Sequence, residues 1–266
     1  MICGILLLSS AYPFVVAWRA NRATTLRSAI IWAASAGLAW GGALFITDLS
    51  PGSIALSLRY LALCLTGCAA VAVLGARRPG VIAWNFVVLA QLGVLLLPIA
   101  EGLGELRLNP LRLIFLGGTL AIGALNYMPT RLAAAVVALG LACGIELALL
   151  QQAENAGQGL ERAAGVSRCL LAISPWLAFR GVKSGRRPTS TFDQIWLGFR
   201  DSFGLVWSQR VRDQFNLAAE NAGWPVVLRW RGLRVLQGMD SLAETTREEI
   251  IAALRALLKR FGPAAE

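Results

Sequence analysis

The chain has 266 residues, of which 56% are hydrophobic and 15% charged, and its mean hydropathy is +0.61. This composition excludes an ordinary soluble domain and indicates a polytopic membrane protein. The net charge of +10 does not indicate a nucleic-acid partner, because residues 188–266 hold ten Arg or Lys against nine Asp or Glu. The basic excess lies in short loops between apolar segments, where it sets membrane orientation.

The sequence contains no histidine. Its absence removes the commonest metal ligand and the usual base of nucleophilic catalysis. The five cysteines fall in apolar segments without a Cys-x2-Cys spacing, which favours packing roles over a zinc or redox site. We therefore predict no metal, no cofactor and no catalytic residue.

Seven apolar segments follow one another from the N-terminus, and each is close to the ~20 residues that span a bilayer. Their ranges are 1–18, 28–47, 54–76, 81–100, 111–127, 132–152 and 165–179. The first has no basic n-region and no cleavage site, so we expect it to be retained as a helix. The sequence thus predicts an all-α polytopic bundle, 1–180, of seven transmembrane helices.

The seventh segment is the weakest, because it is short and contains Arg168 and Pro175. If 165–179 only lay at the membrane interface, the bundle would have six spans. Loop charges favour seven: the loops after the odd-numbered segments hold ten Arg or Lys and no acid, whereas the others hold two against five acids. The positive-inside rule then places the N-terminus outside and the C-terminal tail in the cytoplasm. The preference for arginine over lysine suggests a GC-rich genome, and hence a bacterial inner membrane.

Four charged residues lie near the predicted outer ends of the spans, at Arg59, Arg112, Glu146 and Arg168. Charges at membrane depth are costly and usually face partners or water. One hypothesis is an Arg59–Glu146 ion pair beside an outward-facing cavity for an anionic ligand, lined by Arg112 and Arg168. The alternative is that the arginines extend to lipid headgroups while Glu146 pairs with one of them for structural reasons.

A basic linker, 181–191, leads into a small α+β unit, 192–266, with a predicted helix–hairpin–helix order. Ser190-x-x-Asp193 resembles a capping box at the start of the first helix. This helix carries an aromatic stripe that includes Trp196, Phe199, Phe203 and Trp207. The stripe is typical either of an interfacial helix on the membrane surface or of a core helix in the tail or an oligomer.

The stretch 226–237 predicts a β-hairpin with its turn at Arg231-Gly232. In that register Arg229, Arg231 and Arg234 share one face, and Arg229 lies opposite Arg234. Like charges facing each other are unfavourable unless an anion or solvent separates them. The three arginines are therefore candidates for contact with the membrane surface or a partner.

Three classes of function are compatible with these features. The first is a non-enzymatic scaffold or accessory subunit whose cytoplasmic tail docks a protein partner, a second copy or the membrane. The second is a transporter or channel component with an anionic-ligand site at the outer charged layer. The third is a membrane-embedded enzyme acting on a lipid-like substrate. The absence of site chemistry favours the first class, with the lipid bilayer as its certain environment.

Overall fold

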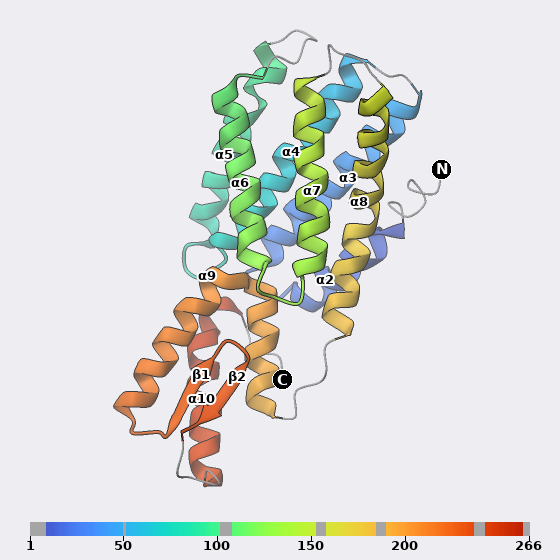
Figure 1. Ribbon diagram of the computed structural model, residues 1–266. Coiled ribbons are helices and arrows are strands. Elements are labelled where there is room, and N and C mark those ends of the chain that lie inside the picture. The colour runs from blue at the N-terminus through green and yellow to red at the C-terminus, as the bar shows by residue number, and fades with distance from the viewer. Residues whose placement is uncertain are drawn as a thin grey trace.

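The structure is a computed structural model, and it describes residues 9–49, 52–101, 108–152, 158–184, 190–236 and 243–262. The described chain is mainly helical, with one small sheet (Figure 1). Its elements are α2 (Ala11–Asn21), α3 (Arg27–Leu49), α4 (Ser53–Leu74), α5 (Val81–Glu101), α6 (Pro110–Tyr127), α7 (Ala133–Gln151), α8 (Gln158–Lys183), α9 (Thr191–Asn221), β1 (Val226–Arg229), β2 (Gly232–Val235), α10 (Glu244–Leu258) and the 3-10 turn η1 (Lys259–Phe261).

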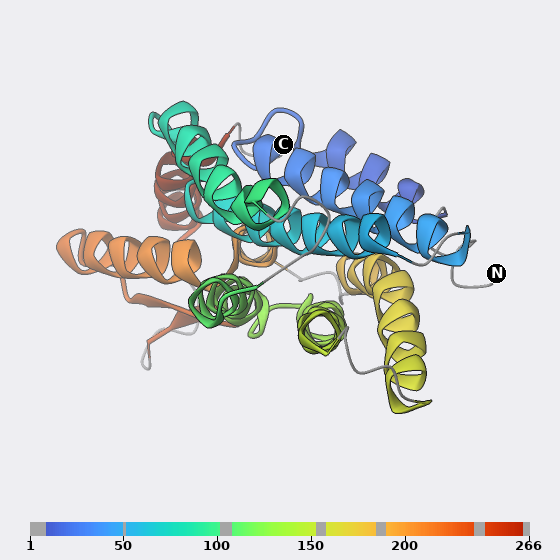
Figure 2. The same cartoon turned by 90° about the horizontal axis from the view of Figure 1, so that it is seen from above.

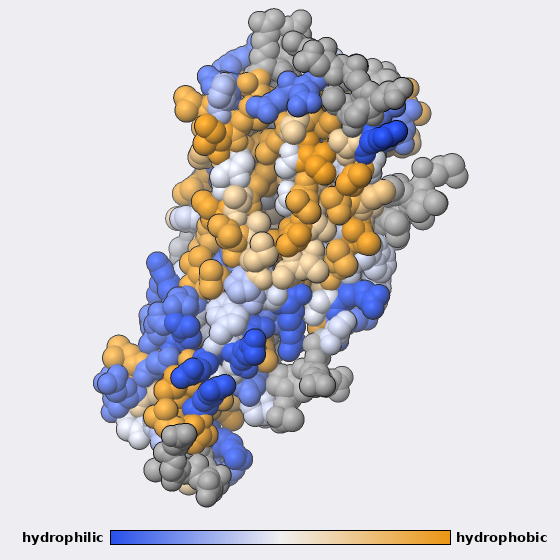
Figure 3. Space-filling view, in the orientation of Figure 1, coloured by the Kyte–Doolittle hydropathy of each residue, from blue (hydrophilic) through white to orange (hydrophobic). Residues whose placement is uncertain are grey.

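Within the described residues, five helices, α3 to α7, are long and apolar enough to cross a membrane. They match the predicted segments 28–47, 54–76, 81–100, 111–127 and 132–152, so a helical membrane protein is confirmed at this level. On the face shown in Figure 3, apolar side chains form a broad band across the middle of the bundle, with hydrophilic surface above and below it. Exposed side chains such as Leu38, Ile82 and Phe86 contribute to the apolar outer surface, as expected of a lipid-facing surface.

The first and seventh predicted segments stand apart from these five. Residues 1–8 of the first segment lie outside the described residues, and its remainder forms part of α2. The seventh segment, 165–179, lies inside α8, which is long but is not among the five apolar helices. A count of seven spans is therefore not established by length and composition.

The helix α8 runs beside α7 in the opposite direction along the bundle (Figure 1). About a third of the way along α8, Ser167 Oγ lies 3.4 Å from the carbonyl oxygen of Ala142 at the middle of α7. Near its end, Gly181 packs so closely on the turn before α7 that a Cβ atom would lie 2.5 Å from the Arg131 carbonyl oxygen. Residues 165–179 are thus part of a continuous helix packed along the length of α7.

The centre of the bundle is α4, which contacts α3, α5, α6 and α7. Its small and apolar side chains are buried, including Leu63, Cys64 and Cys68. Gly67 lets Leu116 and Thr119 of α6 come within 3.4 Å of where its Cβ would be. This use of small residues at helix contacts is typical of membrane bundles.

All turns that follow α2, α4 and α6 lie at one end of the bundle, called here the basal end; the opposite end is the distal end (Figure 1). The chain returns to the basal end through α8 and there forms the C-terminal unit, residues 190–262, made of α9, the hairpin, α10 and η1. The view from above shows α9 and α10 beneath one side of the bundle (Figure 2).

The hairpin register differs from the predicted one. Val226 pairs with Val235, Leu228 with Leu233, and Arg229 with Gly232, so the two turn residues are Trp230 and Arg231. Arg234 lies opposite Val227 rather than Arg229, and the predicted opposition of two arginines is wrong. The register is fixed by α9, because Asn216 exchanges two hydrogen bonds with the backbone of Leu228 at 2.7 and 3.2 Å.

The aromatic stripe of α9 is buried, which corrects the hypothesis that it faces the membrane surface or a partner. The side chains of Trp196, Phe199, Phe203 and Trp207 are at most 7% exposed. They form one apolar core with α10, the hairpin and the basal ends of α3, α4 and α5. Phe261 of η1 closes this core with ring centroids 4.9 to 5.3 Å from Phe199, Phe203 and Trp207. The alternative interpretation, a core helix, agrees with this arrangement.

Candidate functional site

The charged residues Arg59 and Glu146 meet inside the distal half of the bundle. Arg59 Nε donates to Glu146 Oε2 at 2.7 Å, and Ser167 Oγ donates to Glu146 Oε1 at 2.7 Å. The Glu146 side chain is 2% exposed and that of Arg59 15%. One carboxylate therefore joins α4, α7 and α8, and its two oxygens are both engaged.

The other two arginines of the predicted layer have carboxylate partners of their own. Arg112 forms an exposed ion pair with Glu101 at 3.1 Å, which joins α6 to α5. Arg168 forms an exposed ion pair with Asp48 at 3.1 Å, which joins α8 to α3. The structure thus distributes the four predicted residues over three ion pairs and does not bring them around one cavity.

A second buried charge pair holds the C-terminal unit to the bundle. Arg200 of α9 donates from Nε and Nη2 to Asp201 Oδ1 at 2.9 and 2.7 Å. Asp201 also accepts the backbone N–H of Arg131 at 3.3 Å, and Arg200 Nη1 donates to the Trp230 carbonyl at 2.9 Å. In turn, Trp230 Nε1 donates to the Pro129 carbonyl at 2.9 Å. These bonds tie α9 and the hairpin turn to the α6–α7 turn.

A kink in α9 is bound by the basal end of α6. Gly204 has a positive φ of 77°, which interrupts the helix and frees backbone groups. Asn126 Oδ1 accepts the Val206 N–H at 3.0 Å, and the Tyr127 hydroxyl donates to the Ser202 carbonyl at 2.9 Å. Asn126, a polar residue of an apolar helix, thus satisfies a backbone N–H group next to the kink in α9.

The three hairpin arginines remain on the surface. Arg229, Arg231 and Arg234 are exposed, and none has a carboxylate within ion-pair distance among the described residues. The hairpin therefore presents three positive charges at the basal side of the molecule. Of the predicted contact residues, these alone are accessible to a partner.

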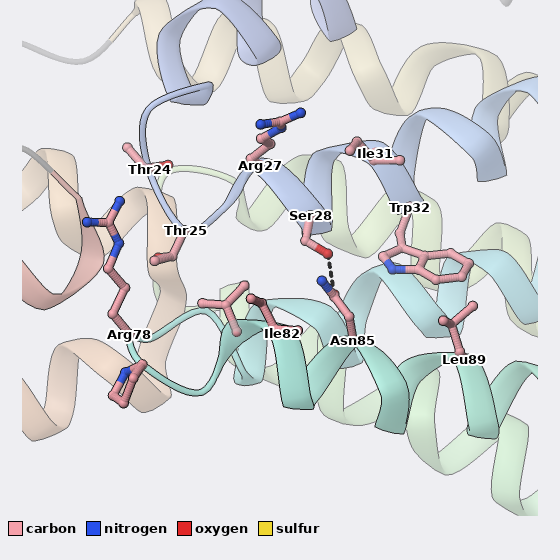
Figure 4. Close-up of a pocket in the computed structure, with 12 residues that line it drawn as sticks. Thr24, Thr25, Arg27, Ser28, Ile31, Trp32, Arg78, Ile82, Asn85 and Leu89 are labelled. Carbon is pink, nitrogen blue, oxygen red and sulfur yellow. Dashed lines mark hydrogen bonds between the residues drawn. The ribbon is translucent and has the colours of Figure 1, made fainter.

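A groove lies between the basal ends of α3 and α5, with a volume of about 720 Å³ (Figure 4). We call it the α3–α5 groove. Its basal rim carries Thr24, Thr25, Arg27 and Arg78. Ile82 lies close to this rim at the start of α5, Ser28 and Asn85 lie next along the groove, and Ile31, Trp32 and Leu89 line it farther along the helices.

The sequence contained the elements of this groove without indicating that they meet. Arg27 and Arg78 belong to the basic loops between apolar segments, and Asn85 lies within the apolar segment 81–100. In the structure Asn85 Oδ1 accepts a hydrogen bond from Ser28 Oγ at 2.5 Å across the groove (Figure 4). The pairing of α3 with α5 at this point has no sequence signal, because it depends on how α4 packs between them.

No cluster of three or more His, Cys, Asp or Glu that could bind a metal occurs among the described residues. Cys64, Cys68 and Cys143 are buried free thiols within spans, whereas Cys169 of α8 is exposed. No protein-family model, no curated protein and no solved structure matches the chain. The fold and its composition thus define the class, a helical membrane protein, and the function rests on the sites described above.

Proposed function

We propose that the protein is a non-enzymatic membrane scaffold or accessory subunit whose C-terminal unit docks an acidic protein partner through its hairpin. The observation that carries this proposal is the common core of the C-terminal unit and the bundle. A unit that shares its core with the membrane helices keeps a fixed position and orientation at the bilayer. Such a unit is suited to holding a partner at the membrane.

Three turns of the bundle bind the unit directly, which supports a fixed position. The Thr25 N–H donates to the Phe261 carbonyl at 2.9 Å, and the Arg78 N–H donates to the Arg260 carbonyl at 3.0 Å. Trp207 Nε1 donates to the Val73 carbonyl at 3.1 Å from the middle of α9. With the bond from Trp230 to Pro129, these contacts involve all three basal turns.

The proposal includes a topology of seven spans, with α8 as the last, in a bacterial inner membrane. The basic loops predicted to be cytoplasmic lie at the basal end beside the C-terminal unit, which supports a cytoplasmic position for both. The N-terminus is then outside. The partner surface is the exposed arginine group Arg229, Arg231 and Arg234, whose charge is complementary to an acidic segment.

The structure favours this function over the two alternatives. An anionic-ligand site for a transporter would need free cations at the distal layer, but Arg59, Arg112 and Arg168 each have a carboxylate partner. An enzyme would need a carboxylate or thiol facing a cavity. Glu146 is instead enclosed by Arg59 and Ser167, and no Asp, Glu or Cys lines the α3–α5 groove.

Photo-crosslinking in cells tests the proposed docking surface. A photoreactive amino acid at Arg231 is expected to give one discrete adduct with a protein, and the same residue at Leu217, exposed on α9, is expected to give none. The adduct at Arg231 should disappear in the Arg229→Glu/Arg234→Glu variant. Equal adducts at both positions, or an adduct that survives the charge reversal, would contradict the proposal.

A further inference from the structure

We propose that the α3–α5 groove is a binding site for one anionic phospholipid, with the phosphate at Arg27 and Arg78 and an acyl chain along the apolar wall. This inference is independent of the proposed docking function. It concerns a different surface, between the basal ends of α3 and α5.

The first argument is the free positive charge at the rim. Arg27 and Arg78 are exposed and have no carboxylate within ion-pair distance in the described part of the chain. Arg27 stacks over the ring of Trp18 at 5.4 Å, a contact that holds the side chain and leaves its charge uncompensated. A phosphodiester is the anion that guanidinium groups bind best, and basic pockets between transmembrane helices bind lipid headgroups.

The second argument is the order of the lining residues along the helices. Ile82, Asn85 and Leu89 follow one another on one face of α5, and at 1.5 Å per residue they extend about 10 Å into the bundle. The Arg27 guanidinium points away from α5, Arg78 lies at the basal side, Ser28 and Asn85 face each other midway, and Trp32 and Leu89 lie farther along the helices (Figure 4). The same order, phosphate, ester and hydrocarbon, occurs along a phospholipid.

The midway position also offers a hydrogen-bond donor. Because Asn85 Oδ1 accepts from Ser28, the orientation of the amide is fixed and its NH2 group faces the groove without a partner among the described residues. An ester carbonyl of a lipid would satisfy this donor. The volume of about 720 Å³ lies within the usual range of ligand pockets, roughly 300–1,000 Å³, and suits a headgroup with part of one chain.

Lipid retention measured by native mass spectrometry tests the site in the full-length protein. The protein is released from mixed vesicles of phosphatidylglycerol and phosphatidylcholine with identical chains, and retained lipids are counted. We expect one phosphatidylglycerol to be retained preferentially. The Arg27→Gln/Arg78→Gln variant should lose this preference about thirtyfold, since two arginines near the surface contribute roughly that factor.

Two further variants separate a built site from general attraction. Arg229→Gln/Arg234→Gln removes the same charge from the same end of the molecule and should keep the preference. Leu89→Trp, which keeps both arginines and fills the deep end of the groove, should weaken retention. An equal loss in the hairpin variant, or full retention in Arg27→Gln/Arg78→Gln, would overturn the proposal.

Competition with inorganic phosphate separates a lipid from a free anion. Millimolar phosphate should leave the bound phosphatidylglycerol in place, because the acyl chain holds it in the groove. Displacement by phosphate together with unchanged retention in Leu89→Trp would mean that the rim binds small anions and that the apolar wall has no role.

Discussion

The distal end of the bundle and the α3–α5 groove differ in whether their arginines form ion pairs with carboxylates. At the distal end Arg59, Arg112 and Arg168 each meet a carboxylate from another helix, so charge is used to fix helix against helix. Around the α3–α5 groove Arg27 and Arg78 meet none among the described residues. Paired charges indicate structure, whereas unpaired charges beside a cavity indicate a binding site. This comparison supports the two proposals, which both place binding at the basal end.

The largest expected effect comes from breaking the buried distal pair. Arg59→Glu places a second carboxylate beside Glu146 and should lower the free energy of unfolding by about 3–5 kcal/mol, as found for buried ion pairs that lose one partner. Thermal unfolding of the purified protein, followed by size-exclusion chromatography, measures this loss. The Arg59→Glu/Glu146→Arg double variant should recover part of it. A double variant no more stable than Arg59→Glu would show that the pair is not an independent unit.

A somewhat smaller loss is expected at the kink of α9. In Gly204→Ala a Cβ atom would lie 2.2 Å from Asn126 Nδ2 at a φ of 77°, so we expect a cost of about 2–4 kcal/mol. Limited proteolysis should then cleave the C-terminal unit while the bundle stays intact. Gly198→Ala is the matched control, because its Cβ meets nothing within 4 Å in the same helix. It should leave the protein equally stable or slightly more so.

The hydrogen bond from Tyr127 to Ser202 should contribute about 1 kcal/mol. Tyr127→Phe keeps the ring and removes only this bond, so amide hydrogen exchange in α9 should become several-fold faster. Tyr12→Phe serves as the control, because that side chain is exposed on α2 and packs on Phe179 through its ring. Equal rates of amide hydrogen exchange in α9 for the two variants would mean that the hydrogen bond between Tyr127 and Ser202 does not stabilise the kink.

The smallest effect is expected at the exposed distal pairs. Arg168→Gln removes the surface ion pair with Asp48 and should change the free energy of unfolding by less than about 1 kcal/mol. The loss is compared with that of Arg59→Glu in the same thermal assay. A loss as large as that of the buried pair would show that Arg168 contributes more than a surface contact.

Element positions could be predicted from the sequence where they depend on local composition. The apolar lengths of α3 to α7 were visible because each helix must satisfy its backbone in lipid by itself. The side chain of Ser190 caps α9 as its spacing predicted, although Asp193 accepts from the Leu233 N–H instead of turning back to Ser190. The capping residue thus predicted where α9 starts, but the sequence did not predict the hydrogen bond between Asp193 and Leu233.

The sites depend on packing between distant segments, and there the sequence was insufficient. A turn at Trp230-Arg231 replaces the predicted one because Arg200 and Pro129 bind Trp230 from outside the hairpin. The aromatic stripe of α9 has the same spacing whether it faces lipid or a protein core. It is buried because α10, η1, the hairpin and the basal ends of α3, α4 and α5 pack around it.

The most direct test of the account is the accessibility of the two ends of α8 in intact cells. Single cysteines at Gln152, exposed just after α7, and at Ser184, exposed just after α8, are placed in a chain without its native cysteines. If α8 crosses the membrane as proposed, a membrane-impermeant thiol reagent labels Gln152→Cys from outside and Ser184→Cys only after the inner face is opened. Labelling of both positions from outside would mean that α8 does not cross the membrane, and the C-terminal unit would then not be cytoplasmic.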